Sequence, residues 1–196
     1  MSIVPVPDGQ LAAVVTYLEM TTRPEITIPS TSLRLEAITP SPAEYRALFA
    51  RIGAPWLWFS RLIMPDAELA AILDHPRVGL FEVRDGEAVA GLLELDARAI
   101  GECELAFVGL VPELSGQGHG RWLLAEAVAR AWALDGVERV HVHTCSLDHP
   151  AALAAYRRAG FVAVRRAVEI FIDPRLAGIL PSDAAPHVPL VAPPSN

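Results

Sequence analysis

The chain has 196 residues, of which 52% are hydrophobic and 20% charged, and its formal net charge is −7. This length is most simply one domain with a sizeable core. The negative charge argues against a nucleic-acid-binding protein, which normally presents a basic patch. No uncharged apolar run approaches the ~20 residues that cross a bilayer, and residues 1–5 lack the features of a signal peptide. Cys103 and Cys145 both fall in predicted strands, which is typical of a cytoplasmic protein without disulfides. We therefore expect a cytoplasmic domain that binds neither nucleic acid nor membranes.

The N-terminal part of the chain predicts an extension followed by the start of the main domain. Residues 1–32 form the extension, with an additional strand over residues 11–18, which are apolar and partly β-branched. Residues 33–38 alternate between apolar and polar side chains, as a half-buried strand does. Ser41 then begins a helix as its cap, with proline at the first helical position and Glu44 three residues after the cap. This helix is expected to run to about Ile52.

Residues 54–65 combine three aromatic side chains with an arginine. Trp56, Trp58 and Arg61 could line a substrate pocket, with Arg61 holding a carboxylate through two hydrogen bonds. Alternatively, the aromatic side chains pack a loop onto the core and Arg61 lies on the surface. The sequence alone leaves both interpretations open.

The remainder of the chain predicts alternating strands and helices. Asp66 caps a helix to Asp74, and Asp85-Gly86 is a strong hairpin signal between two strands. The other predicted elements are a strand over 102–111, a helix over 118–134, a strand over 139–145, a helix over 150–159 and a strand over 161–172. Six prolines after residue 173 predict an irregular tail, residues 173–196, that is packed on the domain or partly disordered.

A glycine-rich turn separates the strand over 102–111 from the long helix. Glycines 116, 118 and 120 remove Cβ atoms that would keep a ligand from the backbone. The first amides of a helix have no partners within it and lie at the positive end of its dipole, so a phosphate or pyrophosphate is the usual ligand. The spacing fits neither a Walker A loop nor a dinucleotide fingerprint. A turn without a ligand is the alternative.

Two motifs around this turn resemble those of the GNAT acetyltransferase superfamily. Ser115-x-x-Gly118-x-Gly120, preceded by Val111-Pro112, resembles its acyl-CoA loop, Gln/Arg-x-x-Gly-x-Gly/Ala. The segment from His149 to Phe161 is similar to its Asn-x-x-Ala-x-x-x-Tyr-x-x-x-Gly-Phe motif, and Ala152, Tyr156, Gly160 and Phe161 fall at the matching offsets. Ser115 and His149 depart from the usual residues. The resemblance covers about residues 78–170.

The resemblance implies an α/β (α+β) fold for residues 33–172. We expect a mixed, mostly antiparallel sheet flanked by about four helices, with a splayed pair of strands that holds acyl-CoA. Acetyl-CoA is then the co-substrate, and its pantetheine arm pairs with the backbone near Leu110 and Val111. The remaining residues implied to contact it are Ser115, Gly116, Gln117, Gly118, His119, Gly120, Arg121, His149 and Tyr156.

The reaction implied is direct attack by a primary amine on the acetyl thioester, without an acyl-enzyme. Tyr156 is the candidate acid for the departing thiolate, because a phenol and a thiol have comparable pKa values, about 10 and about 8.5. Its hydroxyl could instead only order the sulfur, or the ring could simply pack. Glu104 is the candidate base, although a bulge is common in this strand and would change which residues share its face. Some family members have no dedicated base.

The resemblance places the acceptor pocket between the first two helices. Trp56, Trp58, Arg61 and Glu94 are its candidate residues, and Glu94 is also the next candidate base. We expect a small-molecule or amino-acid-like amine as the acceptor. A protein N-terminus or lysine is the other acceptor class, and a non-catalytic module that binds acyl-CoA is the alternative function.

No metal is expected in this protein. His141 and His143 share a strand face and His149 follows, but ordinary hydrogen bonds explain such a pair equally well. Cys145 has no evident activating base nearby, which disfavours it as a nucleophile. A homodimer is compatible with the family, although the sequence shows no specific interface signal.

Overall fold

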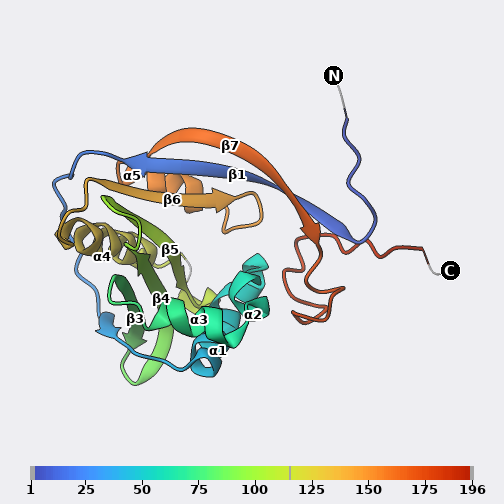
Figure 1. Ribbon diagram of the computed structural model, residues 1–196, viewed down its shortest axis with the longest axis horizontal. Coiled ribbons are helices and arrows are strands. Elements are labelled where there is room, and N and C mark those ends of the chain that lie inside the picture. The colour runs from blue at the N-terminus through green and yellow to red at the C-terminus, as the bar shows by residue number, and fades with distance from the viewer. Residues whose placement is uncertain (1–2, 115, 195–196) are drawn as a thin grey trace.

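The computed structural model describes residues 3–114 and 116–194, which form a mixed α/β fold around one seven-stranded sheet (Figure 1). The strands are β1 (Gln10–Met20), β2 (Arg34–Ala37), β3 (Val78–Asp85), β4 (Ala88–Asp96), β5 (Glu102–Leu110), β6 (Arg139–Cys145) and β7 (Val162–Ile172). The α-helices are α1 (Pro42–Gly53), α2 (Ser60–Ile63), α3 (Asp66–Leu73), α4 (His119–Ala133) and α5 (Ala152–Arg158), and the short 3₁₀ helices are η1 (Ala54–Trp56) and η2 (Pro112–Leu114). This architecture confirms the predicted fold class, with five α-helices in the described residues where about four were expected.

The strands follow the order β2-β3-β4-β5-β6-β1-β7 across the sheet. Every neighbouring pair is antiparallel except β5 and β6, which run parallel. The N-terminal strand β1 therefore lies inside the sheet, between β6 and β7. In Figure 1, β1 and β7 extend together beyond the helices as a long two-stranded arm.

Local signals explain several element boundaries. Ser41 accepts a hydrogen bond from the Glu44 amide, and Glu44 bonds back to the Ser41 amide, so the predicted capping box begins α1. Gly86 has a φ of +59° in the hairpin between β3 and β4. The expected cap of α3 is wrong by one residue: Pro65 is the N-cap and Asp66 is the first helical residue. Proline fixes a φ that suits this entry, and Asp66 still places its charge in the first turn.

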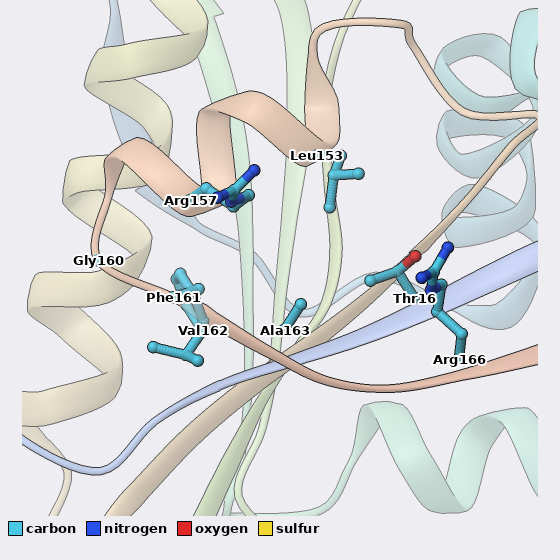
Figure 2. Close-up of a pocket in the computed structure, with 8 residues that line it drawn as sticks. All are labelled: Thr16, Leu153, Arg157, Gly160, Phe161, Val162, Ala163 and Arg166. Atoms are coloured by element: carbon cyan, nitrogen blue, oxygen red, sulfur yellow. The ribbon is translucent and has the colours of Figure 1, made fainter.

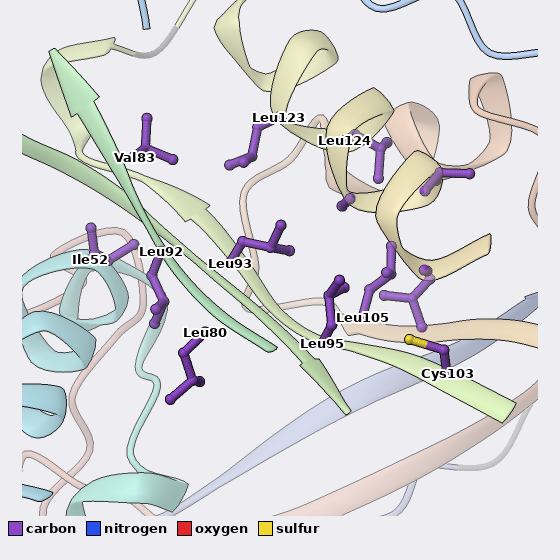
Figure 3. Packing of buried hydrophobic residues seen from close by; sticks show 14 of the residues in the cluster. Ile52, Leu80, Val83, Leu92, Leu93, Leu95, Cys103, Leu105, Leu123 and Leu124 are labelled. Carbon is purple, nitrogen blue, oxygen red and sulfur yellow. The ribbon is translucent and has the colours of Figure 1, made fainter. Parts of the chain in front are cut away.

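The hydrophobic core lies on both faces of the central strands. Helix α4 packs on one face, where Leu123 and Leu124 lie near Leu95 and Leu105 (Figure 3). Helix α1 packs on the other face, where Ile52 lies near Leu92. The alternation of side chains along β4 and β5 thus divides the core into two layers and fixes the sheet between the helices.

The C-terminal tail is held by one buried arginine. Arg175 pairs with Asp173 at 2.7 Å, and both side chains are 2% exposed. Its guanidinium also donates to backbone carbonyls of the tail, those of Ala184, Ala185, Val188 and Pro189. Leu180 and Ala185 form a second small core with Leu57 from the turn after η1. The tail is therefore fastened beside the residues that were predicted to line the acceptor pocket.

Candidate active site

The central feature of the site is the separation of β5 from β6. Their parallel pairing covers only Glu102–Glu104 against Arg139–His141. Beyond Glu104, β5 continues to Leu110 on the side of β4, and β6 continues to Cys145 on the side of β1. The two strands therefore diverge, as expected for the splayed pair, and the backbone edges that face the opening have no strand partner in the described residues.

A bulge in β5 decides which side chains share the face of Glu104. The register shifts at this point, because Glu94 faces Phe107 whereas Leu95 faces Leu105. Ala106 is the extra residue of this bulge. Simple alternation along β5 would place Ala106 on the face of Glu104, but the bulge places Phe107 on that face instead. Glu94, Glu104 and Phe107 consequently belong to one face of the sheet, the face covered by α1.

The glycine-rich turn leads directly into the N-terminus of α4. Gly116 and Gly118 have φ values of +78° and +83°, and Gly118 is the N-cap, where no side chain caps the helix. A Cβ atom at position 116, 118 or 120 would meet no other atom within 4 Å. Gly120 lies inside the first turn, where glycine costs about 1 kcal/mol relative to alanine. Neither packing nor a positive φ explains Gly120, but a ligand that approaches the backbone would.

The described polar residues of this turn have few partners among the residues that the structure describes. Gln117 donates to the Glu113 carbonyl at 2.9 Å, and the His119 ring is hydrogen-bonded to Thr31 at 3.0 Å. The side chain of Arg121 is exposed at the start of α4. Ser115 lies outside the described residues. Leu110 pairs with Gly91, and the Val111 amide donates to the Ala90 carbonyl, so both residues belong to the wall of the opening formed by β5.

Glu104 and His143 form an ion pair across the point where β5 and β6 diverge. The His143 Nδ1 atom lies 3.0 Å from a carboxylate oxygen of Glu104. The hydrogen bond to His143 holds the pKa of Glu104 below its ordinary value, against the opposing effect of burial. The same bond raises the pKa of His143. Glu104 is therefore a carboxylate whose basicity depends on whether His143 is charged.

Tyr156 projects from α5 with its ring packed edge-on against Phe161, and its side chain is half-buried. Burial raises the pKa of its phenol, and the negative charge of Asp148 raises it further. The hydroxyl therefore keeps its proton throughout the physiological range. By contrast, burial raises the pKa of Cys145 to about 11, so this thiol is not an ionised nucleophile at neutral pH.

The two tryptophans of the segment after α1 have different surroundings. Trp58 packs against Phe49 and Phe107, and a Cβ at Gly53 would lie only 2.4 Å from it. Trp56 instead lies beside two rings, those of His149 and His187, at centroid distances of 5.0 and 5.8 Å. His149 of the second motif thus contacts the predicted acceptor segment. His187 places the C-terminal tail beside the same segment.

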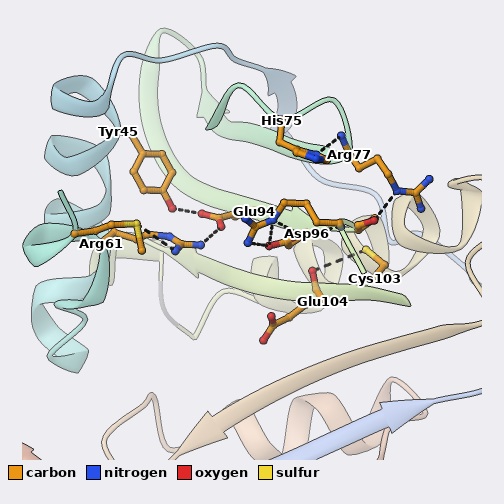
Figure 4. A network of polar contacts seen from close by, with 11 residues as sticks. Tyr45, Arg61, His75, Arg77, Glu94, Asp96, Cys103 and Glu104 are labelled. Carbon is orange, nitrogen blue, oxygen red and sulfur yellow. Dashed lines mark hydrogen bonds and ion pairs between the residues drawn. The ribbon is translucent and has the colours of Figure 1, made fainter. Parts of the chain in front are cut away.

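Arg61 and Glu94 form a buried ion pair (Figure 4). The guanidinium donates to Glu94 at 2.5 Å, lies over the ring of Phe107, and belongs to a side chain that is 11% exposed. Glu94 is fully buried and also accepts from the Tyr45 hydroxyl. The positive charge of Arg61 is therefore matched within the protein. The alternative that places Arg61 on the surface is wrong, because the aromatic layer and Glu94 cover it.

Asp148 was not singled out from the sequence, yet it connects three parts of the site. Its carboxylate accepts from Thr144 and from the Cys145 amide, and from the Trp58 ring nitrogen at 3.3 Å. A carboxylate just after a strand predicts only a local turn. The bond to Trp58 spans 90 positions of sequence, so no local signal could have found it.

A separate groove of about 530 Å³ runs between α5 and β7 (Figure 2). Leu153 and Arg157 of α5 line one side, and Val162 and Arg166 of β7 line the other. None of the predicted site residues lines this groove. It lies on the outer part of the sheet, next to the last strand.

The sequence matches the model of the acetyltransferase (GNAT) family over residues 45–161. The chain belongs to the GNAT acetyltransferase family. The matched residues include the glycine-rich turn, the diverging strands and Tyr156, whereas β1, β2 and β7 lie outside them. No protein of curated function matches this sequence significantly.

Solved structures give the same fold for this GNAT protein. A GCN5-related N-acetyltransferase from Sphaerobacter thermophilus is 20% identical with a TM-score of 0.60, over 82% of this chain and 51% of its own. A GCN5-related N-acetyltransferase from Kribbella flavida is 21% identical with a TM-score of 0.56, over 87% and 63%. An IAA acetyltransferase from Bacillus cereus is 22% identical with a TM-score of 0.52, over 68% and 79%. The chain thus spans only about half to two thirds of the length of the first two. None of the helices in the described residues has the length and apolar character to span a membrane.

Proposed function

We propose that this GNAT protein is an N-acetyltransferase that moves an acetyl group from acetyl-CoA to a primary amine, most simply a small molecule or an amino-acid-like acceptor. The observation that carries the proposal is the opening between β5 and β6, which leads to the uncapped N-terminus of α4. An opening lined by free backbone suits an extended pantetheine arm. Uncapped amides at a helix N-terminus suit a pyrophosphate.

Residues of this chain fit both ends of acetyl-CoA. The β5 wall at Leu110 and Val111 would hold the pantetheine arm, and the amides of residues 116–120 would hold the pyrophosphate, since the Arg121 amide already donates to the Gly118 carbonyl. Arg121 adds an exposed positive charge to that end. The long donor that Gln or Arg usually supplies at position 115 is replaced by Ser115, so the backbone amides would carry most of the binding.

Glu104 and Tyr156 are proposed as the groups that move protons. Attack requires a neutral amine, and Glu104 at the apex of the opening would accept the amine's proton directly or through water. Tyr156 holds its proton and would donate it to the departing sulfur. Burial raises the pKa of a thiolate as well as that of a phenol, so a sulfur leaving into this site is a stronger base than in water.

The acceptor would enter on the face that carries Glu104, next to Trp56 and its two histidine neighbours. An aromatic ring flanked by His149 and His187 presents an apolar surface with polar edges, which suits an amine attached to an apolar or planar group. Arg61 and Glu94 pack beneath this region, and their opposite charges already match each other. The net charge of −7 mildly favours a neutral or cationic acceptor.

Thermal stability with acetyl-CoA, beside CoA, ATP and NAD, tests the proposed binding. Ligand at 100 times its dissociation constant adds about 2.7 kcal/mol, which raises the melting temperature of a domain of this size by several degrees. We expect the rise with acetyl-CoA and CoA only. A rise that is not followed by acetylation of any amine would favour the acyl-CoA-binding module, and no rise would contradict the proposed function altogether.

Gly120→Asp is the matching variant for this experiment. Its carboxylate would fill the open space at the first turn of α4 and repel a pyrophosphate. An acid at this end of a helix is itself favourable by about 0.3–1 kcal/mol, so the free protein should melt at the same temperature or slightly higher. Loss of the ligand-induced rise without loss of basal stability would locate binding at the turn. A full rise in the variant would place it elsewhere.

The pairing of Glu104 with His143 predicts the pH dependence of the rate. While His143 is charged, it holds the pKa of Glu104 down and occupies the carboxylate. We therefore expect kcat/KM to rise with pH through the raised pKa of His143, which lies above its ordinary value of about 6.5. In His143→Gln this rise should disappear, whereas His141→Gln, which changes the neighbouring ring, should keep it. Identical pH profiles for His143→Gln and the wild type would remove Glu104 from the role of base.

A further inference from the structure

Strand β7 ends the sheet as a long and unprotected edge. It has 11 residues and pairs with β1 on one side only, whereas β2 at the opposite edge has four residues. Edge strands in soluble proteins are usually short, or interrupted by proline or covered. β7 contains no proline, and among the described residues only β1 pairs with it. It has one bulge, at Val164, but residues 165–172 pair regularly with β1, and Val168 and Ile172 are 64% and 63% exposed. Such an edge is suited to pairing with another strand.

The sequence of β7 is complementary to itself when it is reversed about Ala167, the middle residue of the strand. In an antiparallel pair centred there, Arg165 of each copy lies opposite Glu169 of the partner subunit. Arg166 lies opposite Val168. The register of β7 shifts at Val164, so beyond this bulge Ala163 lies opposite Ile170. Opposite charges that face each other across two strands stabilise the pair, and this register forms two such pairs at once.

Other symmetric registers are disfavoured by the same residues. In an antiparallel pair related by a twofold axis perpendicular to the sheet, two residues that lie opposite each other must point to the same face. The axis must therefore pass between two copies of the same residue. Centring on Arg165, Arg166 or Glu169 places two like charges directly opposite each other, which is destabilising. Centring on Val168 leaves Arg165 opposite an aromatic ring, that of Phe171, and Glu169 opposite Ala167. Of these registers, only the one about Ala167 places Arg165 opposite Glu169.

The groove beside α5 lies where this register would place apolar side chains. Val168, Ile170 and Ile172 lie on the face of the sheet that carries α5, the face on which Thr16 and Arg166 line the groove. Beyond the bulge at Val164, the register sets Ala163, which lines the groove, opposite Ile170 of the partner subunit. The exposed end of each β7 would therefore cover the groove of the other copy.

We propose that this protein forms a homodimer in which β7 pairs antiparallel with β7 of a second copy about a twofold axis at Ala167. The two seven-stranded sheets then continue as one. The partner is a second copy of this chain, because the charge pattern of the edge matches its own reverse. This inference does not depend on the proposed acetyl transfer.

Charge reversal tests the register, with mass in solution measured by light scattering after size-exclusion chromatography. The wild type should be a dimer. Glu169→Arg should raise the dimer dissociation constant at least about tenfold, because both ion pairs become like-charge pairs. Arg165→Glu should do the same. An equimolar mixture of the two single variants should form a heterodimer, because every Arg then faces a Glu again. The double variant R165E/E169R should dimerise alone.

Two controls separate this interface from unfolding and from a general charge effect. Arg51→Glu makes the same change in charge at an exposed position on α1 and should remain a dimer. Ala167→Cys places two thiols opposite each other on the axis and should cross-link under mild oxidation, whereas Val168→Cys should not. Circular dichroism should be unchanged in every variant. A monomeric wild type, a dimer that tolerates Glu169→Arg, or a mixture that fails to associate would each overturn the proposal.

Discussion

Replacing Tyr156 by Phe is expected to lower kcat by about 10²–10⁴-fold, the usual contribution of a positioned acid. The change removes only the hydroxyl and keeps the ring packed against Phe161. Stability and acetyl-CoA binding should therefore hardly change. Because the raised pKa keeps this phenol protonated, the wild-type rate should show no fall near pH 10 that could be assigned to it.

Steady-state kinetics with acetyl-CoA and one amine measure this effect, and Tyr17→Phe is the matched control. Tyr17 lies on β1, where its ring stacks with Arg165 at 4.0 Å, a contact that phenylalanine keeps. A Tyr156→Phe variant with normal kcat would show that water or the solvent protonates the thiolate. A raised KM for acetyl-CoA with normal kcat would show that the hydroxyl only orders the thioester.

Patterns that act over a few residues predicted much of this fold. The capping box at Ser41 and the hairpin at Gly86 both depend on neighbours within four positions, and both are confirmed. The glycine-rich turn and the second motif were sufficient to identify the family, because their spacing reflects a strand, a helix start and a helix that must meet at one ligand. Local patterns therefore identified the family and the turn at which we propose that the cofactor binds.

Features that depend on distant partners were beyond the sequence. The position of β1 between β6 and β7 is decided by pairing across the whole chain, and the pattern of residues 11–18 gives only the existence of a strand. The bulge at Ala106 changes which side chains join Glu104. The Asp148–Trp58 bond and the contact of the tail with Trp56 join segments that no short pattern relates. The proposed acceptor side of the site consists largely of such contacts.

The ion pair between Arg61 and Glu94 shows how a distant contact changes an interpretation. Arginine beside two tryptophans suggested a ligand for a substrate carboxylate. In the structure its charge is matched by Glu94, and Tyr45 occupies the other carboxylate oxygen. Arg61 can bind a substrate only by giving up a buried partner, which is costly. Its main effect should therefore be on the stability of the face that carries Glu104.

Replacing Glu94 by Gln is expected to lower the free energy of unfolding by about 3–5 kcal/mol, because the guanidinium of Arg61 is left buried without an opposite charge. The glutamine side chain can still accept the hydrogen bond from the Tyr45 hydroxyl. The loss of stability therefore measures the contribution of the Glu94 charge. The double variant E94Q/R61M should recover most of the stability, since it removes the unpaired charge as well. Asp66→Asn is the matched control: it breaks the pair with Arg46, but the Asp66 side chain is 82% exposed, so its loss should stay within about 1 kcal/mol.

Urea unfolding of the four proteins, followed by circular dichroism, compares these losses. Glu94→Gln could be no more destabilising than Asp66→Asn and instead raise KM for the amine. In that case Arg61 and Glu94 bind the substrate, and their ion pair forms only in the absence of substrate. A large loss of stability in Glu94→Gln could instead be reversed in the double variant, with KM for the amine unchanged. That result would show that the ion pair stabilises the fold and does not bind the acceptor. The recognition of the acceptor would then be left to Trp56, a predicted pocket residue, and to the rings of His149 and His187 beside it.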